Sequence, residues 1–472
     1  MKKISLIALV LIFVTITNNI FAQYKINIQI KNMKDTVYLG YYYGDKQYAK
    51  DTTVLNNKGI GVFEGTDTLK GGIYFILLPN NTFFELLIDN DQNFSVKTVY
   101  NDKDKESLSS NLSIKNANSD MEMYVDYQKF MMQRNKLAIK LRKRLKNTSD
   151  TIQERIIKDS LKIVTNEVIS NWNKIEKDYP KSLLTSILLC NKEIEVPEPP
   201  KDEKGIIIDS SFQYHYYKNH YFDYVNFSDE RLLRTQFYHA KINRYFDKLV
   251  IPIPDTIIKE SKWILNKASE NKEVFKYTLQ FLFNKYNNSN IMGMDKVFVF
   301  YADNYYLNGK APWADSLWLT KVKKHTDEIR PNLIGNKAPI LNLLSVNDEF
   351  ISLQMIEAKY TILFFYEPNC GHCKKATPIM KKLSDKYWEK GVEVLGIYTQ
   401  NNKKEWMDFI KSQNLDNWIN AWDPYNQSNF RQNYDVKATP TIYLLDKDKN
   451  IIGKRIDVET VDKILQDKFN IK

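Results

Sequence analysis

Two cysteines separated by two residues, in the run Cys370-Gly371-His372-Cys373, are the residues of this chain best suited to redox chemistry. Thiols at this spacing can meet in a reversible disulfide when the second cysteine lies in the first turn of a helix. The first cysteine then lies at the helix N-terminus, where unpaired N–H groups and the helix dipole stabilise a thiolate. The spacing therefore predicts a redox-active dithiol.

The flanking residues predict a strand-to-helix junction around this dithiol. The apolar, aromatic-rich run Tyr360–Tyr366 is typical of a buried strand, and apolar residues recur at helical spacing at Ala376, Ile379, Met380 and Leu383. A Cys-x-x-Cys pair is also half of many zinc sites. No second Cys-x-x-Cys or Cys-x-x-His exists in the sequence to complete four ligands, so we expect no metal site and no cofactor.

The N-terminus has the pattern of a signal peptide. Lys2 and Lys3 form a basic start, Ile4 to Ile16 is an apolar segment too short to span a bilayer comfortably, and Ala22 ends a region suited to cleavage. No cysteine follows the apolar segment, which disfavours a lipoprotein anchor. We therefore expect an exported, periplasmic protein without a stable membrane anchor.

The remaining cysteine and the histidines suggest structural roles. Three cysteines are too few for a disulfide framework. Cys190 lies in an apolar, helical-looking run and is either a buried, inert thiol or one half of an intermolecular disulfide. His215, His220 and His239 are scattered at spacings that favour structural histidines over a metal site.

The charge pattern excludes one class of partner. The 68 basic and 57 acidic residues give a net charge of +11, and they are dispersed along the chain. The densest basic run, Lys140 to Lys146, fits the solvated face of an amphipathic helix. We expect no nucleic-acid partner.

Periodicity divides the chain into a multidomain α+β protein. Alternation at Ile26, Ile28 and Ile30 begins a series of strands at hairpin spacing and predicts a small β-sandwich-like domain. Two helical stripes follow, the second opening with a capping box at Thr151 and Glu154. A proline-rich linker, a helical region and an α/β domain complete the chain. The predicted boundaries are a signal peptide at 1–22, a β-rich domain at 23–115, a helical hairpin at 116–194, a linker at 195–205, a helical domain at 206–331 and the α/β domain at 332–472.

The last of these domains resembles the TlpA/ResA branch of the thioredoxin superfamily. The motifs that carry the resemblance are Gly335 to Pro339, Cys370 to Cys373, Pro378 within the helix, and Ala438-Thr439-Pro440-Thr441, in the order and spacing of that branch. Upstream segments resemble an uncharacterised domain found before such thioredoxin domains in exported bacterial proteins. The resemblance implies a C-terminal thioredoxin fold and thiol–disulfide oxidoreductase activity in cell redox homeostasis.

The resemblance also implies a role for each site residue. Cys370 attacks or is attacked, Cys373 resolves the mixed disulfide, and Pro440, in cis, presents its backbone to the partner chain. His372 between the cysteines stabilises the Cys370 thiolate and makes the disulfide more oxidising, so we predict a reduction potential above that of thioredoxin.

The sequence differs from the family at the positions whose acidic side chains accept the proton of the resolving cysteine. Phe364 stands where thioredoxins often bury an acid, and Ala376 stands where ResA-like proteins carry a glutamate. Glu367 is the nearest candidate base for Cys373, with an ordinary loop carboxylate as the alternative. Asn369 replaces the usual tryptophan before the first cysteine, which should alter the surface offered to partners.

Two alternatives and several open points remain. A peroxiredoxin-type peroxidase is disfavoured because Leu363 and Glu367 stand where that site needs Pro and Thr. The other alternative is a binding or assembly protein whose N-terminal domains act on a partner, with a redox-regulated thioredoxin appendage. The expected partners are exported proteins with cysteines or disulfides and an unidentified electron donor or acceptor. The sequence leaves open the direction of exchange and whether the helical region forms a homodimer.

Overall fold

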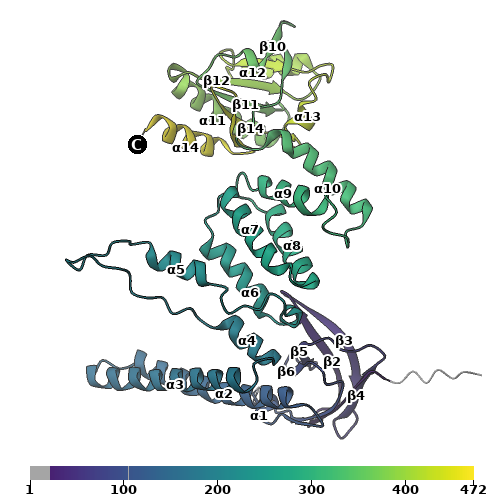
Figure 1. The fold of residues 1–472 in the computed structure, drawn as a ribbon. Coiled ribbons are helices and arrows are strands. Elements are labelled where there is room, and N and C mark those ends of the chain that lie inside the picture. The colour runs from purple at the N-terminus through teal and green to yellow at the C-terminus, as the bar shows by residue number, and fades with distance from the viewer. Residues whose placement is uncertain (1–21, 105, 472) are drawn as a thin grey trace, which may run out of the picture. The chain divides into compact units, whose positions relative to one another are not determined.

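The computed structural model describes residues 22–104 and 106–471. The chain divides into two compact units, one ending at Leu249 and the next beginning at Val250 (Figure 1). This division lies inside the predicted helical domain at 206–331, and the boundaries predicted from sequence stay predictions. The signal-peptide prediction falls on residues 1–21, outside the described part. No helix of the described ranges is long and apolar enough to cross a membrane.

The first unit begins with two four-stranded sheets, in the orders β4-β1-β7-β8 and β3-β2-β5-β6. Alternate residues of β1 point into one core shared by both sheets, where Ile26, Ile28 and Ile30 are buried. The β-sandwich-like fold predicted from alternation is therefore confirmed. The strands are β1 (Tyr24–Lys31), β2 (Thr36–Tyr43), β3 (Lys46–Val54), β4 (Ile60–Gly65), β5 (Gly72–Leu77), β6 (Phe83–Ile88), β7 (Asn93–Val99) and β8 (Ser113–Lys115).

A helical hairpin follows the sandwich. After the short α1 (Ser107–Ser110), α2 (Ser119–Lys146) and α3 (Thr151–Asp178) pack along a buried seam that includes Leu141 and Ile157. The predicted capping box is wrong in detail. Asp150 is the N-cap of α3, and its carboxylate accepts hydrogen bonds from the N–H groups of Ile152 and Gln153, so Thr151 is already inside the helix.

The rest of the first unit is helical, and Arg231 connects it to the sandwich through an ion pair. Its guanidinium donates to the carboxylates of Asp89, at 2.6 Å, and Asp229, at 2.8 Å. The helices are α4 (Leu183–Asn191), α5 (Phe212–His220), η1 (Glu230–Arg234), α6 (Phe237–Arg244) and the π-helix η2 (Tyr245–Leu249). The predicted linker at 195–205 lies between α4 and α5, within this unit.

The second unit opens with helices that dock on the α/β domain. The Lys454 ammonium is 6% exposed and contacts the Asp295 carboxylate and the Asn332 side chain, which both come from the helical segment. The Asn332 amide also donates to the Asn433 carbonyl at 3.1 Å. The helices are α7 (Pro254–Ala268), α8 (Lys272–Asn287), α9 (Asp295–Tyr301), η3 (Ala302–Tyr306), α10 (Ser316–Ile329) and η4 (Arg330–Asn332).

The C-terminal domain is a seven-stranded sheet in the order β10-β9-β13-β12-β11-β14-β15. The central β11 is parallel to β12 and antiparallel to β14. Its side chains point alternately into two separate cores, with Phe364 and Tyr366 on one face of the sheet and Phe365 on the other. Helices α11, α12 and α14 cover the first face. This is the predicted α/β thioredoxin fold.

The bounds of the elements in this domain are β9 (Asn342–Ser345), β10 (Phe350–Ser352), η5 (Leu353–Met355), β11 (Tyr360–Tyr366), α11 (Gly371–Tyr387), η6 (Trp388–Lys390), β12 (Val392–Tyr398), α12 (Lys403–Ser412), β13 (Ile419–Trp422), α13 (Phe430–Asn433), β14 (Thr441–Asp446), β15 (Ile451–Lys454) and α14 (Val458–Phe469).

Candidate active site

Cys370 is the N-cap residue of α11, directly after the loop that leaves β11. Its backbone is extended, and its sulfur accepts a hydrogen bond from the Cys373 N–H at 3.3 Å. The strand-to-helix junction predicted from sequence thus brings the first thiol to the helix N-terminus, where backbone N–H groups favour a negative charge.

The surroundings of Cys370 favour its thiolate. Burial alone would raise its pKa, but hydrogen bonds from the Cys373 thiol and backbone, the Thr439 side chain and the His372 backbone outweigh burial and hold the pKa below its ordinary value. In the thiol form, its sulfur donates to the Thr439 carbonyl at 3.1 Å. A half-buried thiol with a lowered pKa is suited to be a nucleophile.

Cys373 has the opposite character. It is fully buried in the core that covers one face of the sheet. Burial, and then its hydrogen bond with the Cys370 thiol, raise its pKa to about 12. The two cysteines are not bonded to one another. The pair therefore combines an accessible thiol that ionises readily with a sheltered thiol that keeps its proton.

The loop before β14 lies against the dithiol. The peptide bond between Thr439 and Pro440 is cis, the geometry that the resemblance implies. His372, Ala376, Pro440 and Arg455 help to line a hollow of about 550 Å³ beside this loop. The buried Asp435 carboxylate forms an ion pair with Arg455 at 2.9 Å. No local pattern in the sequence indicates this contact.

Glu367 lies in the loop between β11 and the dithiol, but its carboxylate points to another partner. It accepts a hydrogen bond from the Thr399 hydroxyl at 3.1 Å, and the backbone of Glu367, rather than its carboxylate, affects the pKa of Cys373. Phe364 is fully buried, as its place in the strand predicts. The structure adds Tyr366, whose hydroxyl accepts from the Trp406 indole at 2.9 Å in the same core as Cys373.

The two residues beside Cys370 face outward. His372 is exposed at the mouth of the hollow. The exposed Asn369 donates from its amide to the Glu405 carboxylate, at the start of α12. Glu405 is a residue that sequence reasoning missed, because nothing in the local pattern links it to a residue 36 positions earlier.

Cys190 is separate from this site. It is 1% exposed within α4, and burial raises its pKa to about 12. These properties favour the inert thiol over the intermolecular disulfide. Among residues 22–104 and 106–471, no three His, Cys, Asp or Glu side chains are grouped so as to hold a metal ion.

Comparison with known proteins identifies the family of the C-terminal domain. A family model described as thioredoxin-like matches residues 357–451. Thiol-disulfide oxidoreductase ResA of Bacillus thuringiensis subsp. konkukian is 30% identical over 131 residues, which are 28% of this chain and 74% of that protein. The chain belongs to the thioredoxin-like thiol–disulfide oxidoreductases.

Other known proteins are also similar to this chain. ResA of Bacillus cereus is 29% identical over 131 residues, 28% of this chain and 74% of that protein. A domain of a possible thiol-disulfide isomerase from Cytophaga hutchinsonii is 38% identical, with a TM-score of 0.29, over 30% of this chain and 95% of that chain. A thioredoxin-like protein from Bacteroides caccae is 22% identical, with a TM-score of 0.44, over 58% of this chain and 98% of that chain.

The oxidoreductase domain is preceded by a segment of unassigned role. A model of a domain of unknown function (DUF5106) matches residues 164–332. The uncharacterised upstream domain expected from sequence is thereby confirmed.

Proposed function

We propose that this protein is an exported, periplasmic enzyme that exchanges disulfides with other exported proteins through Cys370 and Cys373. The observation that carries the proposal is the contrast between the two thiols. Cys370 caps a helix and has a lowered pKa, whereas Cys373 is buried and its pKa is raised to about 12. The basic and apolar pattern of residues 2–16 supports export.

One round of exchange needs only these two thiols and the two sulfur atoms of the partner disulfide. The Cys370 thiolate attacks one sulfur of a partner disulfide, forming a mixed disulfide and releasing the other partner sulfur as a thiolate. Cys373 loses its proton and attacks Cys370, which forms the Cys370–Cys373 disulfide and releases the reduced partner. The reverse sequence oxidises a partner dithiol. Either direction needs an exported electron donor or acceptor to reset the pair.

Trapping of the mixed disulfide tests the proposal. Cys373→Ala should accumulate disulfide-linked complexes with exported proteins, because the resolving thiol is missing. Cys370→Ala should form none and should lose exchange activity. The matched control Cys190→Ala should keep exchange activity and, because Cys373 is present, should accumulate no complexes. Normal biological function in the Cys370→Ala strain would instead favour the binding or assembly protein with a redox-regulated appendage.

Glu367 is proposed as the group that accepts the Cys373 proton. Its loop adjoins the buried thiol, although its carboxylate is bonded to Thr399. Glu367→Gln keeps an acceptor for that hydroxyl and removes the base, so the resolving step should slow several-fold and need higher pH. An unchanged rate and pH profile of disulfide exchange would leave proton transfer to water.

A further inference from the structure

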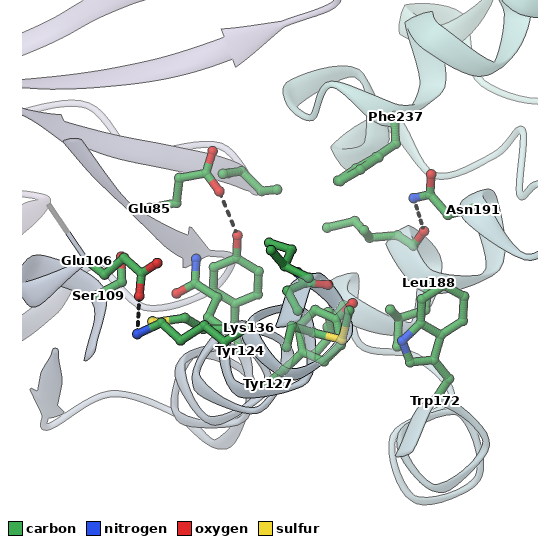
Figure 2. Close-up of a pocket in the computed structure, with 18 residues that line it drawn as sticks. Glu85, Glu106, Ser109, Tyr124, Tyr127, Lys136, Trp172, Leu188, Asn191 and Phe237 are labelled. Carbon is green, nitrogen blue, oxygen red and sulfur yellow. Dashed lines mark hydrogen bonds and ion pairs between the residues drawn. The ribbon is translucent and has the colours of Figure 1, made fainter. Parts of the chain in front are cut away.

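The first unit contains a groove of about 800 Å³ that the dithiol does not use (Figure 2). It lies between the sandwich and the helices α2, α3, α4 and α6. In Figure 2, Glu85 and Glu106 stand on one side and Phe237 and Leu188 on the other, with Trp172 on a neighbouring helix and open space between them. Its size is in the range of ligand sites.

One face of α2, over residues 124–139, lines this groove. The lining positions on α2 recur at intervals of three and four residues from Tyr124 to Ile139, so they form a single stripe about 22 Å long. The facing wall is a shorter stripe on α4, which includes Ile187 and Leu188. Both walls are mainly apolar, and the adaptable side chains of Met131 and Met132 lie at their centre. The residues of α2 that line the groove are Tyr124, Tyr127, Gln128, Met131, Met132, Asn135, Lys136 and Ile139.

Glu85 gives the groove a negative charge, and within the described ranges its carboxylate makes no ion pair. It accepts hydrogen bonds from the hydroxyls of Tyr42, at 2.8 Å, and Tyr124, at 3.2 Å, and from the Gln236 side-chain amide at 3.5 Å. Burial and then Glu85 itself raise the pKa of Tyr124, so that its hydroxyl keeps its proton and remains a donor. The other acid of the groove, Glu106, is already paired with Lys136.

The groove also contains a buried polar atom that has no partner in the described part of the chain. The side-chain oxygen of Gln128 is an acceptor without a donor, whereas the Trp172 side chain hydrogen-bonds with the Tyr127 hydroxyl. Buried polar groups are nearly always satisfied, because leaving one unpaired costs about 1–3 kcal/mol. A backbone N–H group of a bound polypeptide supplies such a donor.

We propose that this groove binds an amphipathic polypeptide segment of a partner protein, with apolar side chains between α2 and α4 and a lysine or arginine at Glu85. The length and apolar character of the α2 stripe fit a segment of several turns, in the manner of a helix in a groove. The charge at Glu85 opposes an anionic amphiphile such as a fatty acid. This inference goes beyond disulfide exchange and concerns how a partner is held.

Binding of two labelled 18-residue peptides to the full-length protein tests the proposal. One peptide carries leucines at helical spacing with lysines elsewhere, and the other has glutamates in place of the lysines. The protein has a net charge of +11, so non-specific attraction favours the acidic peptide. A preference of tenfold or more for the lysine peptide, measured by fluorescence anisotropy, therefore reports the groove.

Two variants locate the binding. Glu85→Gln retains acceptors for the two tyrosine hydroxyls and should weaken the lysine peptide about tenfold. Met131→Glu should abolish its binding, whereas Ile163→Glu, at a 59% exposed position on α3, should leave it unchanged. Equal affinity of all these variants, or displacement of the peptide by oleate, would overturn the proposal. Exchange with a small disulfide should be normal in every variant, so a failure here is distinct from a failure of the proposed enzyme function.

Discussion

At the scale of residues, the two thiols of one motif differ because their surroundings differ. The pKa of Cys370 is held below its ordinary value by hydrogen bonds that outweigh its burial, and the pKa values of Cys373 and Cys190 are raised to about 12 by burial. The Cys370 thiolate therefore stabilises the folded, reduced protein above the ordinary thiol pKa, and this stabilisation is lost as the pH falls through the lowered pKa. For the two buried thiols the sign is reversed, and their contribution is lost as the pH rises towards 12.

Alkylation of the reduced protein checks these differences. Between about pH 6 and pH 8, iodoacetamide should modify Cys370 alone, since the thiolate is the reactive form. Mass spectrometry of peptides from the labelled protein measures this at each pH. Unfolded protein is the control and should be labelled at all three cysteines. Labelling of Cys373 or Cys190 at a rate similar to that of Cys370 would contradict the assignment.

His372 is expected to set the direction of exchange. It is exposed beside Cys370, and we expect its imidazole to stabilise the thiolate and with it the reduced form. We predict a reduction potential above about −270 mV, the value for thioredoxin. His372→Pro should lower it, because proline removes the imidazole beside Cys370. Equilibration with glutathione measures both values, and a wild-type potential at or below that of thioredoxin would show the prediction to be wrong.

At the scale of elements, the periodic segments were predictable and the contacts between them were not. The strand Tyr360–Tyr366 and the helix after the cysteines form as their apolar spacing predicts. The N-cap of α3 was assigned one residue too late, because Asp150 and Thr151 are both good capping residues and only the backbone geometry distinguishes them. The contact between Asn369 and Glu405 depends on how α12 packs, which no local pattern encodes.

The ion pair between Lys454 and Asp295 joins two elements and should contribute to stability. Asp295→Ala would leave a 6% exposed ammonium without its carboxylate, so the free energy of unfolding should fall by about 3 kcal/mol. Urea titration followed by circular dichroism measures the change. The control is Asp255→Ala, which removes a solvent-exposed pair with Lys296 and should cost less than about 1 kcal/mol. Equal effects of the two substitutions would contradict a structural role for Lys454.

At the scale of the whole molecule, the mature chain should begin close to its first strand. Cleavage after Ala22 would leave Gln23 as the N-terminus, and β1 starts at Tyr24. N-terminal sequencing of protein purified from the periplasmic fraction checks both the cleavage site and the location. Recovery of the protein only from the cytoplasm, with residues 1–22 intact, would refute export.

The sequence by itself determined the chemistry and the order of the parts. The signals were local: the cysteine spacing, the proline that follows it, the Thr-Pro-Thr loop and two kinds of periodicity. Local patterns can be recognised in a sequence without knowledge of the fold. The helix-start position already predicted that Cys370 ionises, but only the tertiary structure decided how Cys373 is buried and that Thr439, far away in the chain, helps to lower the pKa of Cys370. It also created the groove along α2, where Glu85 from the sandwich meets Tyr124 from the helix. Both depend on residues distant in sequence, which only folding brings together.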